Sequence, residues 1–400
     1  MSLWERLQAL ARIGAAPDGQ GLVRWPFTPA EAEAVAQVRA WMEADGLRTR
    51  RDGAGNLFGR REGTDPAAAA VLVGSHLDTV RGGGSYDGAL GVLGAMEAVA
   101  GLPALRRPVE VVAFTNEEGN RYPALLGSRA LTGALLPDEL DRRDPDGMPL
   151  REAMAAAGLD PAALAGCAAQ PGRYAAYLEL HIEQGPVLEA SGTPAGIVER
   201  IAGLRMGTAT LLGRADHAGT TPMDRRADAL RAAAGALSAA YAAADGLGRP
   251  AVLTCGRLTL RPGSPNVVPA AVELTLDMRD AEVGRLDRLA EAAHAAFAAA
   301  AEAHGVKLRW EMRPGTPPTP MDPGLCDILE AAARDLGLPC LRMTSGAGHD
   351  AMAVARIMPA AMVFVPCRGG RSHTPDEYAS PEACANGAAL LREAVRRCAS

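Results

Sequence analysis

The sequence predicts an α/β protein whose main domain is interrupted by a smaller α+β domain. Strand and helix signals alternate through residues 1–202, a pattern typical of a mostly parallel sheet covered by helices on both faces. From about Gly203 the order becomes β-α-β-β-α-β, the ferredoxin-like split pattern. The α/β style resumes near the C-terminus. We therefore expect one domain from residues 1–202 and 316–400 and an inserted domain from residues 203–315.

The elements of the first segment have local signals. Thr28, Pro29 and Glu31 form a capping-box sequence with proline at the first helical position. Residues 70–74 are a short apolar run that ends at a glycine, as a buried strand does. By such criteria we expect helices at residues 29–45, 89–100 and 125–135, and strands at residues 70–74, 109–114 and 177–182.

The inserted segment and the C-terminal segment follow the same rules. Long alanine-rich stretches predict the helices of the insertion, and apolar runs between them predict its strands. Several prolines between residues 314 and 320 predict a stiff, extended connection. We expect strands at 205–212, 251–260, 272–278, 306–312 and 361–366, and helices at 227–244, 281–303, 326–336 and 381–399.

The charge and the cysteines exclude several classes of protein. The chain has 400 residues, with 41 Lys+Arg against 47 Asp+Glu, so its formal net charge is −6 and no basic field for nucleic acid or anionic lipid is expected. The only lysine, Lys307, stands in Gly-Val-Lys-Leu, which is not a phosphate-loop sequence. The seven cysteines are odd in number and form no Cys-x-x-Cys pair, which indicates reduced thiols rather than disulfides or a zinc ribbon.

No segment predicts export or membrane insertion. The N-terminal stretch carries charged residues early and lacks an apolar run of signal-peptide type. No other run approaches the ~20 apolar residues of a membrane span. We therefore expect a cytoplasmic protein without a membrane partner.

Histidines and carboxylates follow the predicted strands. His76 and Asp78 come directly after the strand at 70–74, where ligands gather in open α/β sheets. In such a His-x-Asp element the histidine can bind a metal while the carboxylate orients an imidazole. Asp87 lies in a glycine-rich loop just before a helix, where a plain N-cap is the alternative interpretation. Each of these signals is weak when it stands alone.

Two further strands deliver the same residue types. Glu117 and Glu118 follow the strand at 109–114, and His181 belongs to the end of the strand at 177–182. Adjacent carboxylates repel each other, and either water at a surface turn or a nearby cation can relieve this repulsion. Beside a cation, one carboxylate can bind the ion while the other stays free as a base. His373 follows the last predicted strand. Such nitrogen and oxygen donors without thiolate indicate Zn²⁺, with Mn²⁺ or Co²⁺ as alternatives.

These residues carry a resemblance to a known family. The chain resembles the hydantoinase/carbamoylase branch of the M20 metallopeptidase-like amidohydrolases, which includes allantoate amidohydrolase, N-carbamoyl-L-amino-acid hydrolase and β-ureidopropionase. The resemblance spans about residues 5–398. It implies a two-metal, aminopeptidase-like catalytic domain and an inserted lid that also forms a homodimer. The motifs that carry it are GSHLDTV…YDG, FTNEEG, LELHIEQGPVLE, DHAGTTPM, PNVVP…DMRD, SGAGHDAM and GRSHTPDE.

The resemblance implies a role for each motif residue. Asp87 would bridge two divalent ions, of which one also has His76 and His181 as ligands and the other has Glu118 and His373. Glu117 would be the general base that moves a proton from water to the leaving nitrogen. The remaining implied roles belong to Asp78 as the partner of His76, to His217 as an oxyanion donor from the lid of the partner subunit, and to Arg279, Asn266, Gln184 and His349 as substrate contacts.

Two arginines near the expected substrate have alternative interpretations. An arginine fork suits a substrate carboxylate, but Arg279 has a salt bridge to Asp280 as its alternative. The family motif Gly-Ile-Ser-His reads Gly370-Arg371-Ser372-His373 here, so that Arg371 either changes substrate contacts or faces solvent. The expected reaction is cleavage of a ureido C–N bond in a small carboxylated substrate, with release of ammonia and CO2. An aminoacylase or dipeptidase of the wider M20 group and a catalytically retired binding protein are the alternatives.

Overall fold

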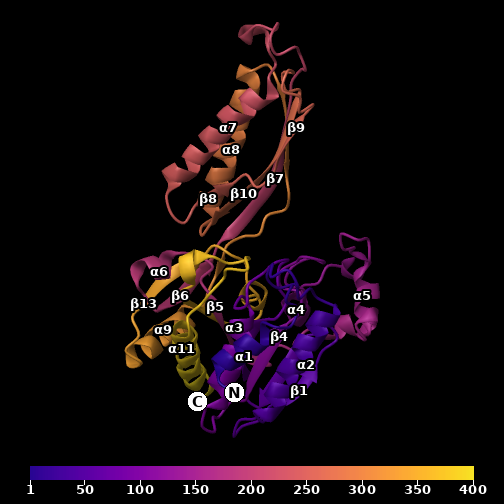
Figure 1. The fold of residues 1–400 in the computed structure, drawn as a ribbon. Coiled ribbons are helices and arrows are strands. Elements are labelled where there is room, and N and C mark those ends of the chain that lie inside the picture. The colour runs from indigo at the N-terminus through magenta and orange to yellow at the C-terminus, as the bar shows by residue number, and fades with distance from the viewer. The chain divides into compact units, whose positions relative to one another are not determined.

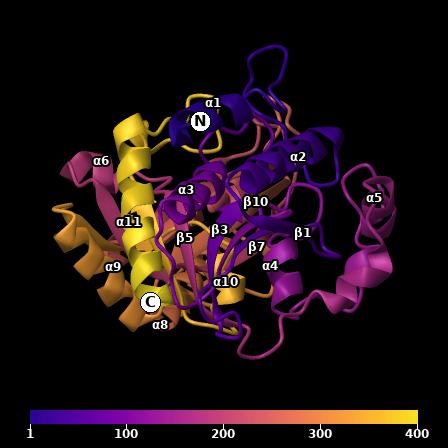
Figure 2. The same cartoon turned by 90° about the horizontal axis from the view of Figure 1, so that it is seen from below.

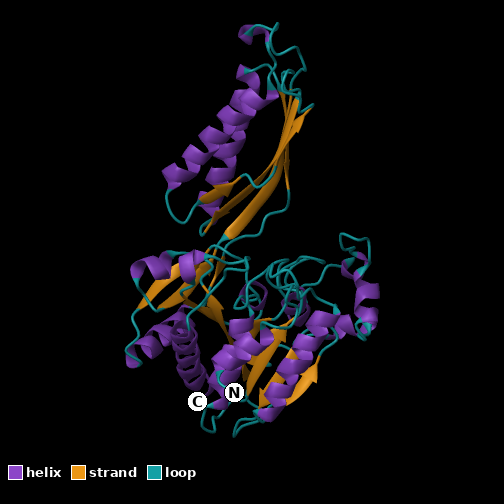
Figure 3. Ribbon diagram, in the orientation of Figure 1, coloured by secondary structure: helices purple, strands orange, loops and turns teal.

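The computed structural model describes residues 1–400 and divides into two compact units. The first unit consists of residues 1–199 and 320–400, and the second consists of residues 200–319 (Figure 1). The chain therefore leaves the first unit once and returns to it once. Figure 3 shows that each unit combines strands with helices, as the predicted α/β class requires.

The first unit is built on a nine-stranded sheet. Its strand order is β1-β2-β4-β3-β5-β14-β6-β12, with β13 paired to β6. The strands are β1 (Arg48–Arg51), β2 (Leu57–Arg61), β3 (Ala70–His76), β4 (Val109–Phe114), β5 (Tyr174–Ile182), β6 (Ala195–Ile201), β12 (Thr319–Pro320), β13 (Cys340–Ser345) and β14 (Ala360–Val365).

Four neighbouring strands, β4, β3, β5 and β14, run parallel to one another. The flanking strands β2 and β6 pair with them in the antiparallel direction. The strands β3, β4 and β14 are buried along their whole length, because helices cover both faces of a parallel sheet. The carboxyl ends of these four strands meet at one edge, and the candidate metal centre lies there.

Helices of the first unit pack closely on the sheet. Leu180 of β5 lies against Gly94 of α3 and Gly387 of α11. Any larger residue at either glycine would clash with Leu180, because its Cβ would lie 2.6 Å from a Leu180 Cδ atom. These glycines let both helices approach β5, and Figure 2 shows α3 and α11 next to each other. The helices are α1 (Leu3–Leu10), α2 (Pro29–Ala44), α3 (Ala89–Ala100), α4 (Leu126–Leu131), α5 (Leu150–Ala156), α6 (Val187–Ser191), α9 (Pro323–Asp335), α10 (Ala351–Val354) and α11 (Pro381–Ala399).

The second unit is an antiparallel sheet with two helices. The sheet has the order β11-β7-β10-β8, and β9 also pairs with β10. Buried alanines of α7, such as Ala232 and Ala236, pack with Leu274 of β10 and Phe297 of α8 in one apolar cluster. The elements are β7 (Gly203–Leu212), α7 (Ala229–Leu247), β8 (Val252–Thr254), β9 (Leu258–Arg261), β10 (Ala271–Asp280), α8 (Val283–Ala303) and β11 (Lys307–Met312).

Some predicted elements differ from the observed ones. The single strand expected at 251–260 is two strands, because at the break Tyr241 accepts the backbone N–H of Cys255 and Thr275 accepts that of Arg257. The helix expected at 125–135 ends at Leu131. The predicted capping box at Thr28 is incomplete, since the Glu31 carboxylate accepts the N–H of Phe27 instead. No helix of the chain combines the length and the apolar character that crossing a membrane requires.

Candidate metal centre

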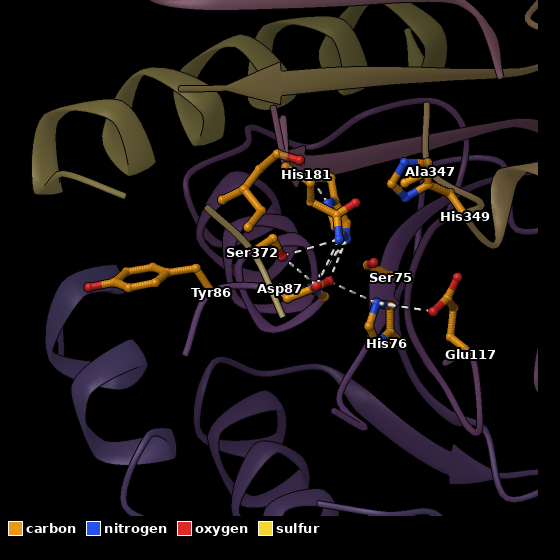
Figure 4. Close-up of polar contacts among 12 residues, drawn as sticks. Ser75, His76, Tyr86, Asp87, Glu117, His181, Ala347, His349 and Ser372 are labelled. Atoms are coloured by element: carbon orange, nitrogen blue, oxygen red, sulfur yellow. Dashed lines mark hydrogen bonds and ion pairs between the residues drawn. The ribbon is translucent and has the colours of Figure 1, made fainter. Parts of the chain in front are cut away.

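Side chains from separate strands converge on Asp87 at the carboxyl edge of the first unit's sheet. His76 ends β3 and His181 belongs to the end of β5, while Asp87 immediately precedes the N-cap of α3. Figure 4 shows Asp87 between the two imidazoles. The Nε2 atom of His181 lies 3.1 Å and that of His76 lies 3.5 Å from Asp87 Oδ1. Asp87 Oδ2 lies 3.2 Å from Nε2 of His373, so each carboxylate oxygen faces at least one imidazole.

Two groups of potential metal ligands share Asp87. The first group is His76, Asp87 and His181, and the second is Asp87, Glu118 and His373. Within each group the ligand atoms lie within 4.8 Å of one another. Glu118 Oε2 is 3.5 Å from His373 Nε2. All five residues therefore offer an imidazole or a carboxylate atom to a small shared volume.

The chemistry of these donors fits divalent cations. The Nδ1 atoms of His181 and His76 face backbone carbonyl oxygens, at 2.9 Å from Ile182 O and 3.0 Å from Asp78 O. A proton held at Nδ1 by such a bond leaves the Nε2 lone pair free for a metal. The buried Oε1 atom of Glu118 has no hydrogen-bond partner, as expected for an oxygen that faces a cation.

The electrostatics of the cluster favour positive charge. Burial would raise the pKa of Asp87, but hydrogen bonds from three imidazoles outweigh it and hold that pKa well below its ordinary value. Hydrogen bonding to Asp87 raises the pKa of His373 to about 9. Burial, followed by the charge of Asp87, raises the pKa of Glu118 to about 7. The raised pKa values of His373 and Glu118 mean that these side chains tend to hold protons in the absence of metal. A metal that binds them displaces those protons.

Glu117 lies beside the ligand groups but belongs to neither. Its Oε2 atom is 3.7 Å from His76 Nε2, and Figure 4 shows its carboxyl directed toward that ring. Burial raises the pKa of Glu117 well above its ordinary value, although the charge of His76 opposes this. A carboxyl group with a raised pKa can accept and return a proton.

Asp78 holds the turn that carries both glutamates. Its Oδ1 accepts the backbone N–H of Glu117 at 3.0 Å, and its Oδ2 accepts that of Glu118 at 3.2 Å. The predicted contact with the His76 ring is longer, at 3.6 Å from the carboxylate. Asn116 takes a left-handed φ of 52° in this turn, a conformation that asparagine tolerates better than most residues. The side chain of Asp78 therefore positions the Glu117–Glu118 turn more directly than it positions His76.

Glu377 was not expected in the centre and connects two of its loops. One of its oxygens accepts the backbone N–H groups of Tyr86 and Asp87, at 2.8 and 3.0 Å. The other accepts the hydroxyl of Ser372 at 2.8 Å, and that hydroxyl is also 3.0 Å from Asp87 Oδ2. Its position four residues after His373 is a signal that sequence reasoning could have used. Glu377 ties the loop of Asp87 to the loop of His373.

Two predicted substrate residues also lie in the first unit. The amide nitrogen of Gln184 donates to Asp87 Oδ2 at 2.8 Å and is 3.3 Å from His373 Nε2. His349 is buried with its ring centroid 4.6 Å from that of His181, and its Nε2 is 2.9 Å from Ser345 Oγ. Both side chains therefore adjoin the ligand groups.

Arg371 pairs with exposed Asp376 at 2.9 Å, which places its guanidinium on the solvent side of the loop.

The other predicted residues lie in the second unit. His217 Nδ1 accepts the N–H groups of Gly219 and Thr220, at 3.0 and 3.2 Å, which keeps the ring proton on Nε2 as a hydrogen-bond donor. The loop of Asn266 adjoins it, since the Asn266 carbonyl accepts the N–H of Ala218. Arg279 pairs with Asp277 at 2.9 Å.

Arg279 and His217 occupy opposite ends of the second unit's sheet. Arg279 is paired in register with Leu204, near the start of β7, whereas His217 follows the far end of β7 at Leu212. The eight residue steps from Ala271 to Arg279 along β10 span about 27 Å at the usual rise per residue. Asp280, the neighbour expected to pair with Arg279, instead pairs with Arg285 at 2.9 Å.

Known proteins resemble this chain over nearly its whole length. The sequence profile of peptidase family M20/M25/M40 matches residues 72–397. The chain is 43% identical over 398 residues to the N-carbamoyl-L-amino acid amidohydrolase of Geobacillus stearothermophilus, covering 98% of this chain and 97% of that protein. It is 37% identical over 404 residues to the allantoate amidohydrolase of Bacillus subtilis, covering 100% and 97%. An amidase of the hydantoinase/carbamoylase family from Burkholderia multivorans has a TM-score of 0.93 at 35% identity, covering 99% and 97%.

The fold and the comparisons define the class of the protein as a hydrolase with an α/β sheet and candidate groups for divalent cations. The chain belongs to peptidase family M20/M25/M40. Within that family it groups with the hydantoinase/carbamoylase amidases.

Proposed function

We propose that this protein is a metal-dependent amidohydrolase that cleaves the ureido C–N bond of a small carboxylated substrate and releases ammonia and CO2. The observation that carries the proposal is the arrangement around Asp87: two ligand groups share this carboxylate, while Glu117 stands beside them and belongs to neither. The names of the two relatives indicate N-carbamoyl-L-amino acids and allantoate as the substrates. The higher identity to the first relative makes N-carbamoyl-L-amino acids the first choice.

Two divalent ions, Zn²⁺ in the first instance, are the cofactors of this proposal. His76 and His181 would hold one ion, Glu118 and His373 would hold the other, and Asp87 would hold both. When bound, such a pair of ions lowers the pKa of water and polarises a carbonyl group. The absence of any cysteine from both groups favours Zn²⁺, Mn²⁺ or Co²⁺ with nitrogen and oxygen ligands.

The side chains supply the proton transfers and the charge stabilisation. The Glu117 carboxylate takes a proton from the attacking water and gives it to the leaving nitrogen. Asp78 keeps Glu117 in place through the backbone of the turn. The Nε2–H group of His217 donates to the oxyanion of the tetrahedral intermediate, where a fixed donor is most effective.

Substrate recognition combines both units in this proposal. The guanidinium of Arg279 binds the substrate carboxylate through a bidentate pair of hydrogen bonds. The ion pair between Arg279 and Asp277 has to break for this contact to form. Asn266, Gln184 and His349 supply further polar contacts. The unit that contains Asp87 is the catalytic domain, and the inserted unit is a lid that excludes water during the reaction.

The lid would also form a homodimer, so that each active site receives side chains from two chains. The position of His217 and Arg279 at opposite ends of the second unit's sheet supports this, because one copy of the unit cannot bring both side chains to one substrate. A symmetric pair of copies offers the His217 end of one lid and the Arg279 end of the other.

Ammonia release tests the proposed reaction. The purified protein should release ammonia from N-carbamoyl-L-amino acids, allantoate or N-carbamoyl-β-alanine, and the preferred substrate should be found by comparing kcat/KM. A chelator should abolish the activity, and Zn²⁺, Mn²⁺ or Co²⁺ should restore it, because the residues of both ligand groups need the ions to act on water. Release of amino acids from N-acetylated substrates or dipeptides, with no ammonia from ureido compounds, would contradict the proposal.

Mixed dimers test the shared active site. His217→Ala and Arg279→Ala should each be inactive alone, whereas a one-to-one mixture of the two chains should recover about a quarter of the wild-type activity. In a random mixture half of the dimers are mixed, and each of these has one intact site of two. The two variants treated separately in the same way are the controls. A monomer in sedimentation, or no recovery in isolated mixed dimers, would contradict the sharing of residues.

A further inference from the structure

We propose that a basic pocket on the first unit, separate from the metal centre, binds a small dianion such as a phosphate ester or a dicarboxylate. The basic pocket is a cavity of about 610 Å³ whose charged lining consists of Arg48, Arg50, Arg60, Arg173, Glu62 and Glu110. These residues come from β1, β2 and the residue after it, the start of β4 and the residue before β5. This inference does not depend on the proposed function.

Strand register brings the charges together. Arg48 of β1 is paired with Arg60 of β2, and Arg60 is paired in turn with Glu110 of β4. Side chains of directly paired residues point to the same face of a sheet. Arg50 lies two residues after Arg48 and therefore shares that face, with its guanidinium 3.7 Å from the ring centroid of Phe58.

Glu110 fixes the arginines but cannot neutralise all of them. Its carboxylate is buried, and it accepts Arg60 and Arg173 on one oxygen, both at 2.8 Å. The other oxygen accepts Tyr174 at 2.9 Å and Arg50 at 3.4 Å. Each oxygen has about two lone pairs, so this carboxylate is saturated. The Glu110 carboxylate therefore holds Arg50, Arg60 and Arg173 in place and has no free lone pair with which to accept a hydrogen bond from Arg48.

The pocket retains positive charge and free donors. Four arginines face two glutamates, which leaves an excess of two positive charges on a chain whose formal net charge is −6. Arg48 makes one hydrogen bond, to Glu62 at 3.0 Å, and Arg50 makes one, to Glu110. Each guanidinium has five N–H donors, and the two side chains are 76% and 43% exposed.

An oxyanion matches these donors better than other ligands do. A phosphate or carboxylate group accepts two parallel N–H bonds from one guanidinium, and two neighbouring arginines held on one face can engage a dianion. The pocket lies at the amino ends of β4 and β5, whereas the metal centre follows their carboxyl ends. The four residue steps from Glu110 to the end of β4 at Phe114 span about 13 Å and the Glu117–Glu118 turn lies beyond them, so a ligand here would not occupy the metal centre.

Calorimetric titration with sulfate tests the proposal, because sulfate remains a dianion at neutral pH and has the oxyanion geometry. The metal-loaded wild-type protein should bind sulfate at constant ionic strength maintained with chloride. The double variant Arg48→Gln/Arg50→Gln should bind it about tenfold more weakly or not at all, since it loses charged hydrogen bonds. Arg12→Gln/Arg356→Gln removes two exposed arginines outside the pocket and should bind like the wild type.

The remaining outcomes separate the sources of the anion. Displacement of sulfate by inorganic phosphate supports a phosphate ester as the ligand, and displacement by succinate supports a dicarboxylate. Equal sulfate binding by the two double variants, or no saturable binding by the wild type, would overturn the proposal. Thermal melts should show that the Arg48→Gln/Arg50→Gln protein folds, because Glu110 keeps Arg60, Arg173 and Tyr174 as partners.

Discussion

Glu117→Gln should reduce kcat by about 10²–10⁴-fold while the protein keeps its metal, because the amide has the shape of the carboxyl group but cannot accept the proton of water. This loss corresponds to about 3–5 kcal/mol of transition-state stabilisation. Glu117 belongs to neither ligand group, so metal content should equal that of the wild type. Burial already favours the neutral form of Glu117, and the neutral glutamine should therefore be tolerated by the fold.

The adjacent residue offers the matched control. Glu118→Gln changes the same chemical group one position later, but it removes a member of the second ligand group. We expect this variant to lose metal as well as activity, and excess metal should restore part of the activity. Steady-state kinetics together with elemental analysis of both variants distinguishes the two roles. An active Glu117→Gln enzyme would exclude Glu117 as the base.

Asp87→Asn should remove the metal from both ligand groups at once, because Asp87 is the residue that the two groups share. Its carboxylate faces His76 and His181 through one oxygen and His373 through the other. Loss of this charge should weaken metal affinity by at least the 10–100-fold typical of residues that only support a ligand. In the metal-free protein the buried imidazoles would also lose their counter-charge, which costs about 3–5 kcal/mol when a buried pair is broken.

Metal titration and thermal unfolding measure these two effects. Asp376→Asn is the control, because Asp376 lies in the His373 loop but pairs with Arg371 at the surface. This control should keep wild-type metal content and melting temperature. If Asp87→Asn kept both ions with wild-type affinity, the shared-carboxylate arrangement would be wrong.

The elements that sequence reasoning located best are those whose whole signal is local. The helix at 89–100, the strand at 109–114 and the helix at 381–399 have the predicted bounds, and Ser380 with Pro381 marks the start of the last helix. The strand β1 was missed, since its sequence Arg-Thr-Arg-Arg has no apolar alternation. It forms because it pairs with β2 at the edge of the sheet, and this partner is not visible in the four residues themselves.

In the candidate site, too, some residues could be predicted from local sequence and others could not. Residue type and position near strand ends brought His76, Asp87, the Glu117–Glu118 pair, His181 and His373 forward as candidates, since imidazoles and carboxylates at strand ends meet at one edge of a parallel sheet. The choice of Glu118 rather than Glu117 as a ligand came from the family resemblance. The support of these residues was not predictable in this way. Glu377 reaches Asp87 from 290 residues away along the chain. Asp78 was assigned to the His76 ring, which its carboxylate approaches at 3.6 Å, and its bonds to the backbone N–H groups of Glu117 and Glu118 were not foreseen.

Local sequence was sufficient to decide the α/β class, most of the long helices and the residue types available for binding cations. Those properties follow from side-chain periodicity and from short motifs, which act over a few residues. The packing of distant segments decided which carboxylate holds which turn, which oxygen of Glu118 stays without a partner, and where the arginines of β1 meet Glu110. Hydrogen bonds and charges depend on distances of a few ångströms, and only the folded chain sets those distances between residues far apart in the sequence.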